Sequence, residues 1–244
     1  MNISVESDIG RRSAQEDMVL HYQDNHGALL AVADGVNGSK TATIIKEQLA
    51  SIFVGYRTRV GAGMAMTPTY NALHELTKNE TSGSTLTMAW IPKARTCAII
   101  AVVGDSPAMV VDGKTEALWI APEHNIETNS AEKQAALQRN ALIVGGCLCV
   151  SRGGPFIQLS RAFGLRELDP ILNRKPEIKV ASLGKHSTLL IGSDGLFDPT
   201  HARTQKEALR IATMVRNGAD AKTLIQNAFQ NQSTDNISAI VCRP

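Results

Sequence analysis

The chain of 244 residues is long enough for one large domain or two small ones, and its 43% hydrophobic and 20% charged residues are typical of a soluble globular protein. Its 25 basic and 23 acidic residues leave a net charge of +2, too balanced to indicate a nucleic acid or an anionic membrane as partner. No apolar run approaches the ~20 residues of a membrane span, and the first six residues lack the character of a signal peptide. We therefore expect a cytoplasmic protein without a membrane or nucleic-acid partner.

The first third of the chain predicts three strands followed by two helices. Residues 2–7 alternate between apolar and polar positions, while 18–22 and 28–33 have the pattern of a hairpin. Over 39–54 the apolar residues recur with the period of a helix, and a second helix is expected from about 68 to 78. A pair of amphipathic helices requires a sheet to cover.

The middle of the chain is rich in β-strand patterns. Four apolar or β-branched runs separated by turn residues predict strands at 84–91, 96–103, 107–111 and 117–120. Residues 121–160 are less regular, apart from a short helix expected at 131–138, because the glycine pairs at 145–146 and 153–154 interrupt them. We predict that 121–160 is a mobile insertion.

The last third predicts two more strands, a second pair of helices and a final strand. The strands are expected at 180–183 and 187–191, the helices at 204–216 and from Asp220 onward, and the final strand at 237–241. Two helix pairs therefore bracket a long run of strands. This order predicts a layered α+β fold, while the arrangement of the strands stays open.

The four cysteines, at positions 97, 147, 149 and 242, are too few for a disulfide scaffold. Three of them lie in apolar surroundings, which predicts buried free thiols. Cys147 and Cys149 are too close in sequence for the usual zinc pair. Free thiols also indicate the cytoplasm as the compartment.

Acidic residues recur where apolar runs end in turns. Asp34 follows the run 29–33, and Asp105 and Asp194 repeat that arrangement further along. The predicted hairpin should also return Glu16 to the neighbourhood of Asp34. The carboxylates that stand at such junctions are Glu16, Asp34, Asp105, Asp194, Asp198 and Asp235.

Two interpretations of these carboxylates are open on spacing alone. They are ordinary solvated turns, or they share a metal centre. Carboxylates brought together repel, and they stay ionised readily only when cations lie among them. A ligand set made of oxygen atoms favours Mg²⁺, Mn²⁺ or Ca²⁺ over zinc.

Seven motifs occur in order between residues 10 and 236: Arg12 with Glu16-Asp17, Asp34-Gly35 with Gly38, Gly83-Ser84-Thr85, Gly104-Asp105-Ser106, Ser160-Arg161 with Gly164, Ser193-Asp194-Gly195, and Asp235-Asn236. Each is weak alone, but the ordered set resembles the protein phosphatase 2C family of metal-dependent serine/threonine phosphatases. The length resembles that of compact bacterial members. The resemblance implies a four-layer α/β/β/α sandwich, with two antiparallel β-sheets flanked by helix pairs. It also implies a single catalytic domain over 1–244, with 121–160 as a flap beside the cleft.

The resemblance further implies a centre of two Mn²⁺ or Mg²⁺ ions, and a third, weaker ion in bacterial relatives. The implied ligands are Asp34, Asp194 and Asp235 for the first ion, Asp34, Glu16 and the Gly35 carbonyl for the second, and Asp105 and Asp198 for the third. Two ions ~3.5–4 Å apart can share a water molecule, lower its pKa and clamp both the attacking and the leaving oxygen of an in-line displacement. No phosphoenzyme is then expected.

Three further residues receive roles from the resemblance. Arg12 matches the arginine that holds the substrate phosphate, where a guanidinium can bind two oxygens and stabilise the transition state. The alternative for Arg12 is a surface ion pair with Glu16. Asp17 and Asn236 are expected to support the ligands from outside the metal centre.

The chain departs from the family pattern near the expected site. Val36 and Asn37 stand where many members have histidine or methionine followed by glycine, so the general-acid histidine proposed for animal members is absent. Pro107 replaces the arginine that usually follows Gly-Asp-Ser, and Leu165 replaces an aspartate. None of these positions is an expected metal ligand. His124 matches a family segment and is expected to make a structural hydrogen bond near the site.

The favoured function is hydrolysis of phosphoserine and phosphothreonine in proteins, with phosphoprotein substrates of a serine/threonine kinase as partners and a monomeric enzyme. One alternative is a catalytically silent relative that binds phosphoproteins, against which the retention of Asp34, Asp194 and Asp235 argues. Another is a different two-metal hydrolase such as a phosphodiesterase, which commonly uses histidine-rich sites. The five histidines other than His124 show no ligand spacing.

Overall fold

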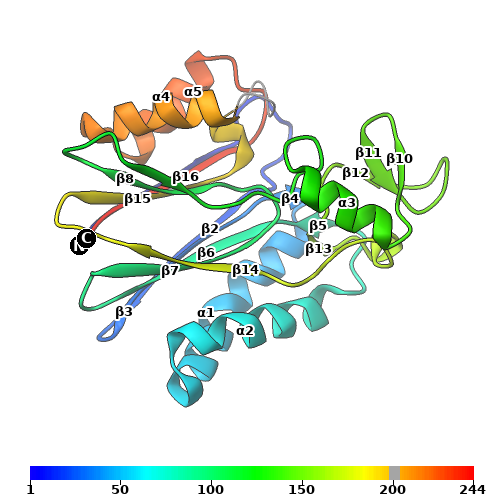
Figure 1. Cartoon of the computed structure of the whole chain (residues 1–244), viewed down its shortest axis with the longest axis horizontal. Helices are drawn as coiled ribbons and strands as arrows, with labels where there is room; N and C mark the ends of the chain where they lie inside the picture. Colours follow the sequence, from blue (N-terminus) through cyan, green and yellow to red (C-terminus); the bar gives the residue numbers. More distant parts are fainter. Residues whose placement is uncertain (198–203) are drawn as a thin grey trace.

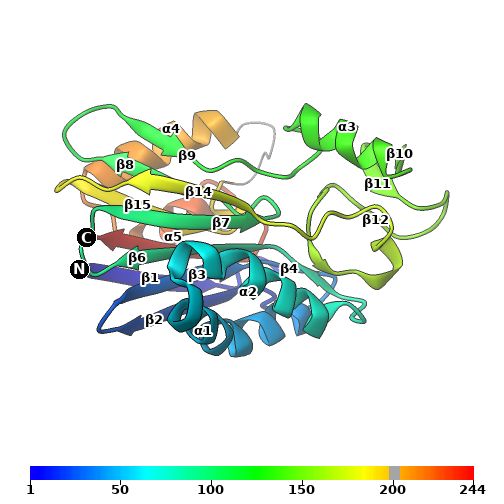
Figure 2. The same ribbon diagram turned by 60° about the horizontal axis from the view of Figure 1, so that its bottom comes forward.

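The computed structural model of the chain describes residues 1–197 and 204–244, in which two five-stranded antiparallel sheets lie face to face between two pairs of helices (Figures 1 and 2). One sheet has the order β1 (Asn2–Asp8), β16 (Ile237–Arg243), β15 (Ser187–Gly192), β8 (Ala108–Asp112) and β9 (Leu118–Ile120). The other has the order β14 (Glu177–Ser182), β7 (Cys97–Val103), β6 (Leu86–Pro92), β3 (Gly27–Ala33) and β2 (Met18–Asp24). The predicted four-layer α/β/β/α sandwich is confirmed.

Each sheet is covered by helices on its outer face. Helices α1 (Lys40–Val60) and α2 (Ala62–Thr77) pack on the sheet that contains β3. Helices α4 (Thr204–Arg216) and α5 (Ala221–Gln230) pack on the sheet that contains β16. Strands β1 and β16 pair with Asn2 opposite Arg243, so the two chain ends lie together at one end of the sandwich (Figure 1).

Strand β3 shows why the sequence has an unbroken apolar run at this point. All of its residues are buried. Leu30 and Val32 pack between the two sheets, while Leu29 and Ala31 pack against the helices. A strand that is buried on both faces has no solvent side to occupy with polar residues, so its alternation disappears.

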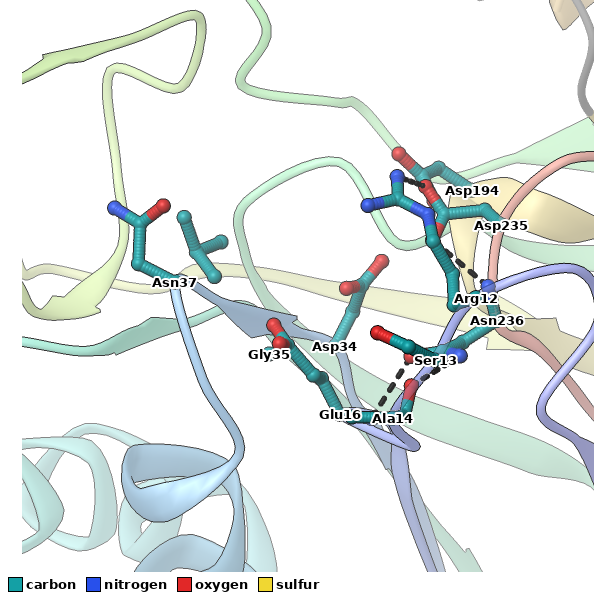
Figure 3. Close-up of a pocket in the computed structure, with 11 residues that line it drawn as sticks. Arg12, Ser13, Ala14, Glu16, Asp34, Gly35, Asn37, Asp194, Asp235 and Asn236 are labelled. Carbon is teal, nitrogen blue, oxygen red and sulfur yellow. Dashed lines mark hydrogen bonds and ion pairs between the residues drawn. The ribbon is translucent and has the colours of Figure 1, made fainter.

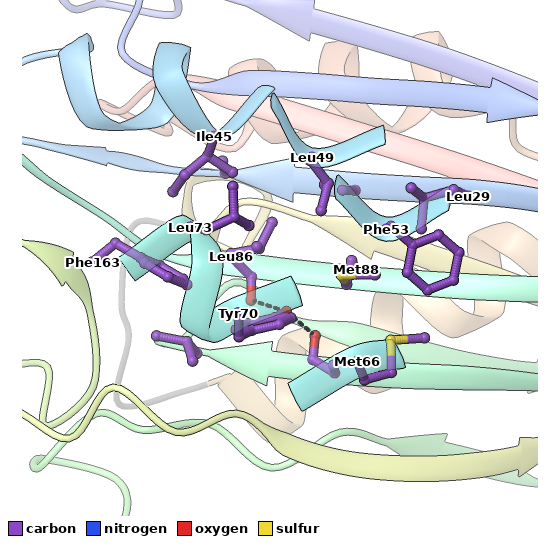
Figure 4. Close-up of a cluster of buried hydrophobic side chains, with 14 of the residues drawn as sticks. Leu29, Ile45, Leu49, Phe53, Met66, Tyr70, Leu73, Leu86, Met88 and Phe163 are labelled. Carbon is purple, nitrogen blue, oxygen red and sulfur yellow. Dashed lines mark hydrogen bonds between the residues drawn. The ribbon is translucent and has the colours of Figure 1, made fainter. Parts of the chain in front are cut away.

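The core beneath α1 and α2 is arranged around Tyr70 of α2 (Figure 4). Its side chain is fully buried, with its ring centroid 5.6 Å from that of Phe163. Its hydroxyl lies 2.7 Å from the carbonyl oxygen of Ala101 and 3.0 Å from that of Leu86. Burial raises the pKa of Tyr70 well above its usual value, so the phenol stays a neutral donor to the sheet.

The second helix differs from its prediction at the start. It begins at Ala62 rather than near Pro68, and the break after α1 is confined to Gly61, whose φ is +82°. Pro68 therefore lies inside the helix, where its missing N–H removes a hydrogen bond. The first turns persist because Ala65 and Met66 are fully buried in the core, and this packing outweighs the local preference.

Residues 121–160 are more regular than the glycine pairs suggested. They contain α3 (Ser130–Gln138), which Asn129 caps by accepting the N–H groups of Ala131 and Glu132, and a sheet of β10 (Leu142–Val144), β11 (Cys147–Cys149) and β12 (Phe156–Ile157). This stretch forms a core of its own with residues from 162–172 and stands at one end of the sandwich (Figure 2). A further small sheet of β13 (Phe163–Gly164), β5 (Gly83–Ser84) and β4 (Gly35–Val36) lies beside it.

The four cysteines are free thiols, as predicted. Cys149 and Cys242 are buried, while Cys97 and Cys147 are partly exposed, so the expected burial holds for two of them. Among helices within 1–197 and 204–244, none has the length and apolar character that crossing a membrane requires.

The hairpin β2–β3 is fastened to α1 by an ion pair that can be tested. Arg57 donates to both carboxylate oxygens of Asp24, at 3.2 and 2.6 Å, and its guanidinium lies 4.5 Å from the ring of Trp90. Asp24 also accepts the N–H groups of His26 and Gly27 in the turn. The two side chains are only 9% and 20% exposed, so solvent screens this pair less than a surface pair.

We expect Asp24→Asn to lower the free energy of unfolding by about 2 kcal/mol at pH 7, because charge-assisted hydrogen bonds to Arg57 are lost. The Arg57 hydrogen bonds lower the pKa of Asp24 in the folded chain. The stabilisation is therefore complete above the unfolded pKa of about 3.9 and is lost progressively as the pH falls from there toward the lower pKa of the folded chain, so only part of it is lost at pH 3.5. Urea unfolding at pH 7 and pH 3.5 measures both effects.

Glu75→Gln is the control variant. It breaks the exposed pair with Lys78 and should change the free energy of unfolding by less than about 0.5 kcal/mol. Equal effects of the two variants would contradict this account.

Candidate functional site

A pocket of about 290 Å³ opens where the strands of both sheets end (Figure 3). Its lining consists of Arg12, Ser13, Ala14, Glu16, Asp34, Gly35, Val36, Asn37, Asp194, Asp235 and Asn236. A smaller pocket of about 140 Å³ shares Asp34, Val36 and Asp194 with it and adds Asp105. The structure thus brings together all the carboxylates singled out in the sequence except Asp198, which lies outside the described residues.

The strand topology explains why residues so distant in sequence meet here. Glu16 lies just before β2 and Asp34 just after β3, and these strands form an antiparallel hairpin that starts with Met18 opposite Ala33. Asp194 follows β15 and Asp235 precedes β16, which are also antiparallel neighbours. The two hairpin-like pairs belong to different sheets, so their acidic ends face each other across the gap between the sheets. The expectation that Glu16 returns to Asp34 is confirmed.

The carboxylates in this pocket carry negative charge that the described protein groups compensate incompletely. Desolvation raises the pKa of Asp34 well above its usual value, and the neighbouring charges of Asp194, Asp17 and Asp105 add to that effect. Burial also raises the pKa of Asp17, against hydrogen bonds from the hydroxyls of Ser193 and Ser238. Within the described part of the chain, Asp17 Oδ2 has no hydrogen-bond partner. A cation among these groups would relieve the repulsion.

Asn236 fixes the loop that carries Arg12 and Glu16. Its side-chain oxygen accepts the N–H of Glu16 at 2.8 Å, and its amide nitrogen donates to the carbonyl oxygens of Ile9 and Ala14, both at 2.9 Å. The residue is 4% exposed. An amide that satisfies both donors and its acceptor in this way determines the position of the loop relative to β16.

Several carboxylates are directed at protein donors. Arg12 donates to Asp235 Oδ2 at 2.7 Å, and Glu16 Oε2 accepts the N–H of Gly38 at 2.9 Å. Arg12 therefore pairs with Asp235, and the ion pair with Glu16 that was the alternative for Arg12 does not form. In residues 1–197 and 204–244, no three His, Cys, Asp or Glu side chains converge on one point as a ready metal site. The donor set of carboxylates and a backbone carbonyl nevertheless has the chemistry that hard divalent ions prefer.

Close backbone packing holds the acidic segments together. A Cβ on Gly10 would lie 1.9 Å from the carbonyl oxygen of Asp235, and one on Gly35 would lie 2.6 Å from that of Glu16. Gly10 also has φ +62°, which disfavours side chains. Only glycine therefore lets these loops approach Asp235 and Glu16 so closely.

The structure shows the surroundings of the positions that depart from the family pattern. Asn37 has φ +57° and Leu165 has φ +51°, and asparagine tolerates this left-handed conformation better than most residues. Val36 packs against the core of the 121–160 region. Pro107 precedes β8, and its carbonyl oxygen accepts the N–H of Gly192.

Three further residues position the acidic turns. Thr85 Oγ1 accepts the N–H of Asp34 at 3.1 Å, and Asn125 Nδ2 donates to Asp105 Oδ2 at 2.9 Å. His124 Nδ1 accepts the N–H of Gly104 at 3.2 Å, which confirms its expected structural hydrogen bond. Sequence reasoning gave no role to Asn125, and the only signal was its place beside His124.

The chain matches known proteins over nearly its whole length. A family model described as protein phosphatase 2C matches residues 3–237. A probable protein phosphatase 2C of Oryza sativa is 30% identical over 96% of this chain and 73% of the relative. One from Arabidopsis thaliana is 27% identical over 96% of this chain but only 64% of the relative. The solved structure of a serine-threonine phosphatase 2C from Toxoplasma gondii has a TM-score of 0.77 at 21% identity, covering 98% of this chain and 93% of that one.

The antiparallel sandwich between helix pairs is thus the fold of a phosphatase of known structure. The chain belongs to the protein phosphatase 2C family, and by that membership it is an enzyme of the protein phosphatase class. The resemblance inferred from the seven motifs is confirmed.

Two glycines with similar backbone conformations test the close packing at the site. Gly10 has φ +62° and Gly145 φ +58°, but a Cβ on Gly145 would meet nothing within 4 Å. Both alanine variants should lose about 1 kcal/mol of stability from the left-handed conformation. Gly10→Ala should lose at least about 2 kcal/mol more, because the added methyl must displace the backbone of Asp235. Thermal or urea unfolding of the two variants measures the difference, and equal losses would contradict the tight contact.

Proposed function

We propose that residues 1–244 form one catalytic domain that hydrolyses phosphoserine and phosphothreonine in proteins by direct attack of water, with two Mn²⁺ or Mg²⁺ ions. The observation that carries this proposal is the gathering of Glu16, Asp34, Asp194 and Asp235 in one pocket with Arg12. Family membership supports the reaction class, and the oxygen-rich donor set supports the choice of ions.

The residues that would hold the ions surround Asp34. In Figure 3 its carboxylate lies between Glu16 on one side and the pair Asp194 and Asp235 on the other, a position suited to bridging. Asp194 and Asp235 would complete one ion, and Glu16 with the Gly35 carbonyl the other. Asp105, in the adjoining pocket, and Asp198, outside the described residues, would hold a third, weaker ion. When bound, such ions lower the pKa of water and clamp the attacking and leaving oxygens.

Asp17 and Asn236 would support this arrangement from outside the ions. Asp17 is 3% exposed and its pKa is influenced by the neighbouring Ser193, Ser238 and Asp34, so it lies where it would orient Asp34. Asn236 holds the backbone of Glu16. Groups that orient ligands in this way typically change metal affinity or activity by about 10- to 100-fold when they are lost.

Arg12 is the residue that we assign to the substrate phosphate. Its side chain is 57% exposed at the mouth of the pocket, and within the described residues its guanidinium donates a hydrogen bond to Asp235. If Asp235 turns to an ion, the guanidinium is released to bind two phosphate oxygens. Such bidentate binding would orient the ester and stabilise charge in the transition state.

Water rather than a side chain is the proposed nucleophile. The four cysteines lie elsewhere, and the described lining of the pocket offers carboxylates and Ser13 without a histidine that could activate it. Val36 has no proton to donate, so protonation of the leaving oxygen would fall to solvent or a bound water. The expected setting is the cytoplasm, with a monomeric enzyme that opposes a serine/threonine kinase.

The metal centre can be tested by turnover and by direct binding. We expect hydrolysis of p-nitrophenyl phosphate and of a phosphothreonine peptide to require Mn²⁺ or Mg²⁺ and to cease in EDTA. Asp194→Asn should lower kcat on the order of 10²-fold or more, because a charged ligand is replaced by a weaker neutral one. Titration of Mn²⁺ by calorimetry should show weakened binding in the same variant.

Asp112→Asn is the matched control for this experiment. Asp112 is an aspartate at a distant turn, where it accepts the N–H groups of Lys114 and Thr115, and asparagine can keep that role. Its activity and Mn²⁺ binding should equal those of the wild type. Folded wild-type protein that hydrolyses neither substrate with any divalent ion would refute the enzyme proposal and favour a silent phosphoprotein-binding relative.

The role of Arg12 predicts a particular kinetic defect. Arg12→Lys keeps the charge but loses the two-pronged geometry, so kcat/KM for the phosphothreonine peptide should fall by about tenfold or more. Arg11→Lys changes the neighbouring residue, whose guanidinium lies 5.5 Å from the ring of Phe229, and should retain most activity. Mn²⁺ affinity should be unchanged in both variants. Equal activity of Arg12→Lys and wild type would remove Arg12 from phosphate binding.

A further inference from the structure

The sheet of β10, β11 and β12 has apolar side chains on both faces. Ile143 pairs with Leu148, and Leu148 pairs with Ile157, so these three form a row on one face that packs into the core of the region. Successive side chains of a strand point to opposite faces. The residues on the other, outer face are therefore Leu142, Val144, Cys147, Cys149 and Phe156.

This outer face is hollowed and largely exposed, although Cys149 within it is buried. Phe156 is 70% exposed and Val144 47%, although both are large apolar residues. Together with Cys147 and Cys149 and the glycines of the adjacent turns, they line a hollow of about 420 Å³. Clustered exposed apolar side chains around a hollow are typical of a binding surface rather than of a face that water simply covers.

The segment that borders the hollow leads directly to the smaller acidic pocket. Ile157, Gln158 and Leu159 line the smaller pocket together with Asp34 and Asp105. Phe156 immediately precedes them, and a strand advances ~3.3 Å per residue, so Phe156 and Gln158 are about 7 Å apart along the chain. The hollow and the smaller acidic pocket are therefore bordered by consecutive residues of one segment.

The charge around the hollow favours an acidic occupant. No aspartate or glutamate occurs between Glu132 and Glu167. Arg152 lies in the turn next to Gly153 and Gly154 of the hollow and is exposed. In the part of the chain that the structure describes, it forms no ion pair. A phosphorylated or acidic segment is thus attracted to this face, and a basic one is repelled.

We propose that the outer face of the β10–β12 sheet docks the part of the phosphoprotein next to the phosphorylated residue. The hollow takes a large apolar side chain two to four residues from the phosphate, and Arg152 contacts an acidic side chain beside it. The substrate class is therefore phosphoproteins with an apolar and acidic flanking sequence. This assignment rests on the proposed function of the acidic pocket, which it deepens. Figures 1 and 2 show the sheet at one end of the molecule, beyond the covering helices.

Peptide kinetics test the docking separately from the chemistry. Phosphothreonine peptides carry leucine or serine at each of positions two to four on either side of the phosphate. We expect wild type to prefer the best leucine peptide about five- to tenfold in kcat/KM, which corresponds to partial burial of one side chain. Phe156→Ser should reduce this preference to less than about twofold through KM, with p-nitrophenyl phosphate hydrolysis unchanged. Val180→Ser, at a 67% exposed residue of the distant strand β14, is the matched control and should keep the preference.

Arg152→Gln tests the charge. At low salt the wild type should prefer peptides with glutamate beside the leucine, and this preference should disappear at high salt. Arg152→Gln should lack the preference at low salt as well. Lys114→Gln, at the β8–β9 turn, should keep it. A leucine-to-serine ratio that is the same in Phe156→Ser and wild type overturns the docking proposal, whether or not p-nitrophenyl phosphate is hydrolysed. If no turnover occurs at all, the proposed function fails, and the docking is decided by binding. The peptides then carry a methylene phosphonate in place of the phosphate ester. The leucine peptide should bind several-fold more weakly to Phe156→Ser than to wild type, while the serine peptide should bind both equally. Equal binding of the leucine peptide to both proteins refutes the proposal.

Discussion

The hydrogen bonds of one amide, that of Asn236, hold the functional end of this molecule in place. They tie the loop before β2 to the start of the last strand, so that Glu16 and Arg12 from the N-terminal part meet Asp235 from the C-terminal part. The pairing of β1 with β16 brings the two segments near each other, and the buried amide then sets their relative position.

The acidic pocket lowers the free energy of unfolding of this protein. Asp34 and Asp17 are desolvated beside further carboxylates, an arrangement that favours their neutral forms and opposes folding with all charges present. The rest of the structure compensates with apolar layers on both faces of each sheet and with satisfied polar contacts such as those of Tyr70. Cations bound among these carboxylates would offset this electrostatic cost, because a ligand that binds only the folded state raises the free energy of unfolding.

The architecture separates the proposed chemistry from the proposed selection of substrates. The strands of the sandwich supply the carboxylates at closely packed ends. There the backbones of Gly10 and Gly35 lie so near Asp235 and Glu16 that no side chain fits between them. The β10–β12 sheet stands beside them on a core of its own, with an outer face that no described element covers. Changes on that outer face can therefore alter which chains bind without moving Asp34 or Asp194.

Outside residues 121–160 the sequence by itself determined most element types and the recurring acidic turns, because apolar periodicity and strand-end turns are local properties of the chain. The order of the four layers came from the family resemblance of the motifs and not from periodicity. The sequence also identified most of the pocket through the ordered motifs. Only the tertiary structure decided that α2 begins before Pro68, since the burial of Ala65 and Met66 outweighs a local signal. The same holds for the partner of Arg12, for the support that Asn125 gives Asp105 and for the two-faced sheet at 142–157. Each of these depends on contacts between residues far apart in sequence, which no local pattern encodes.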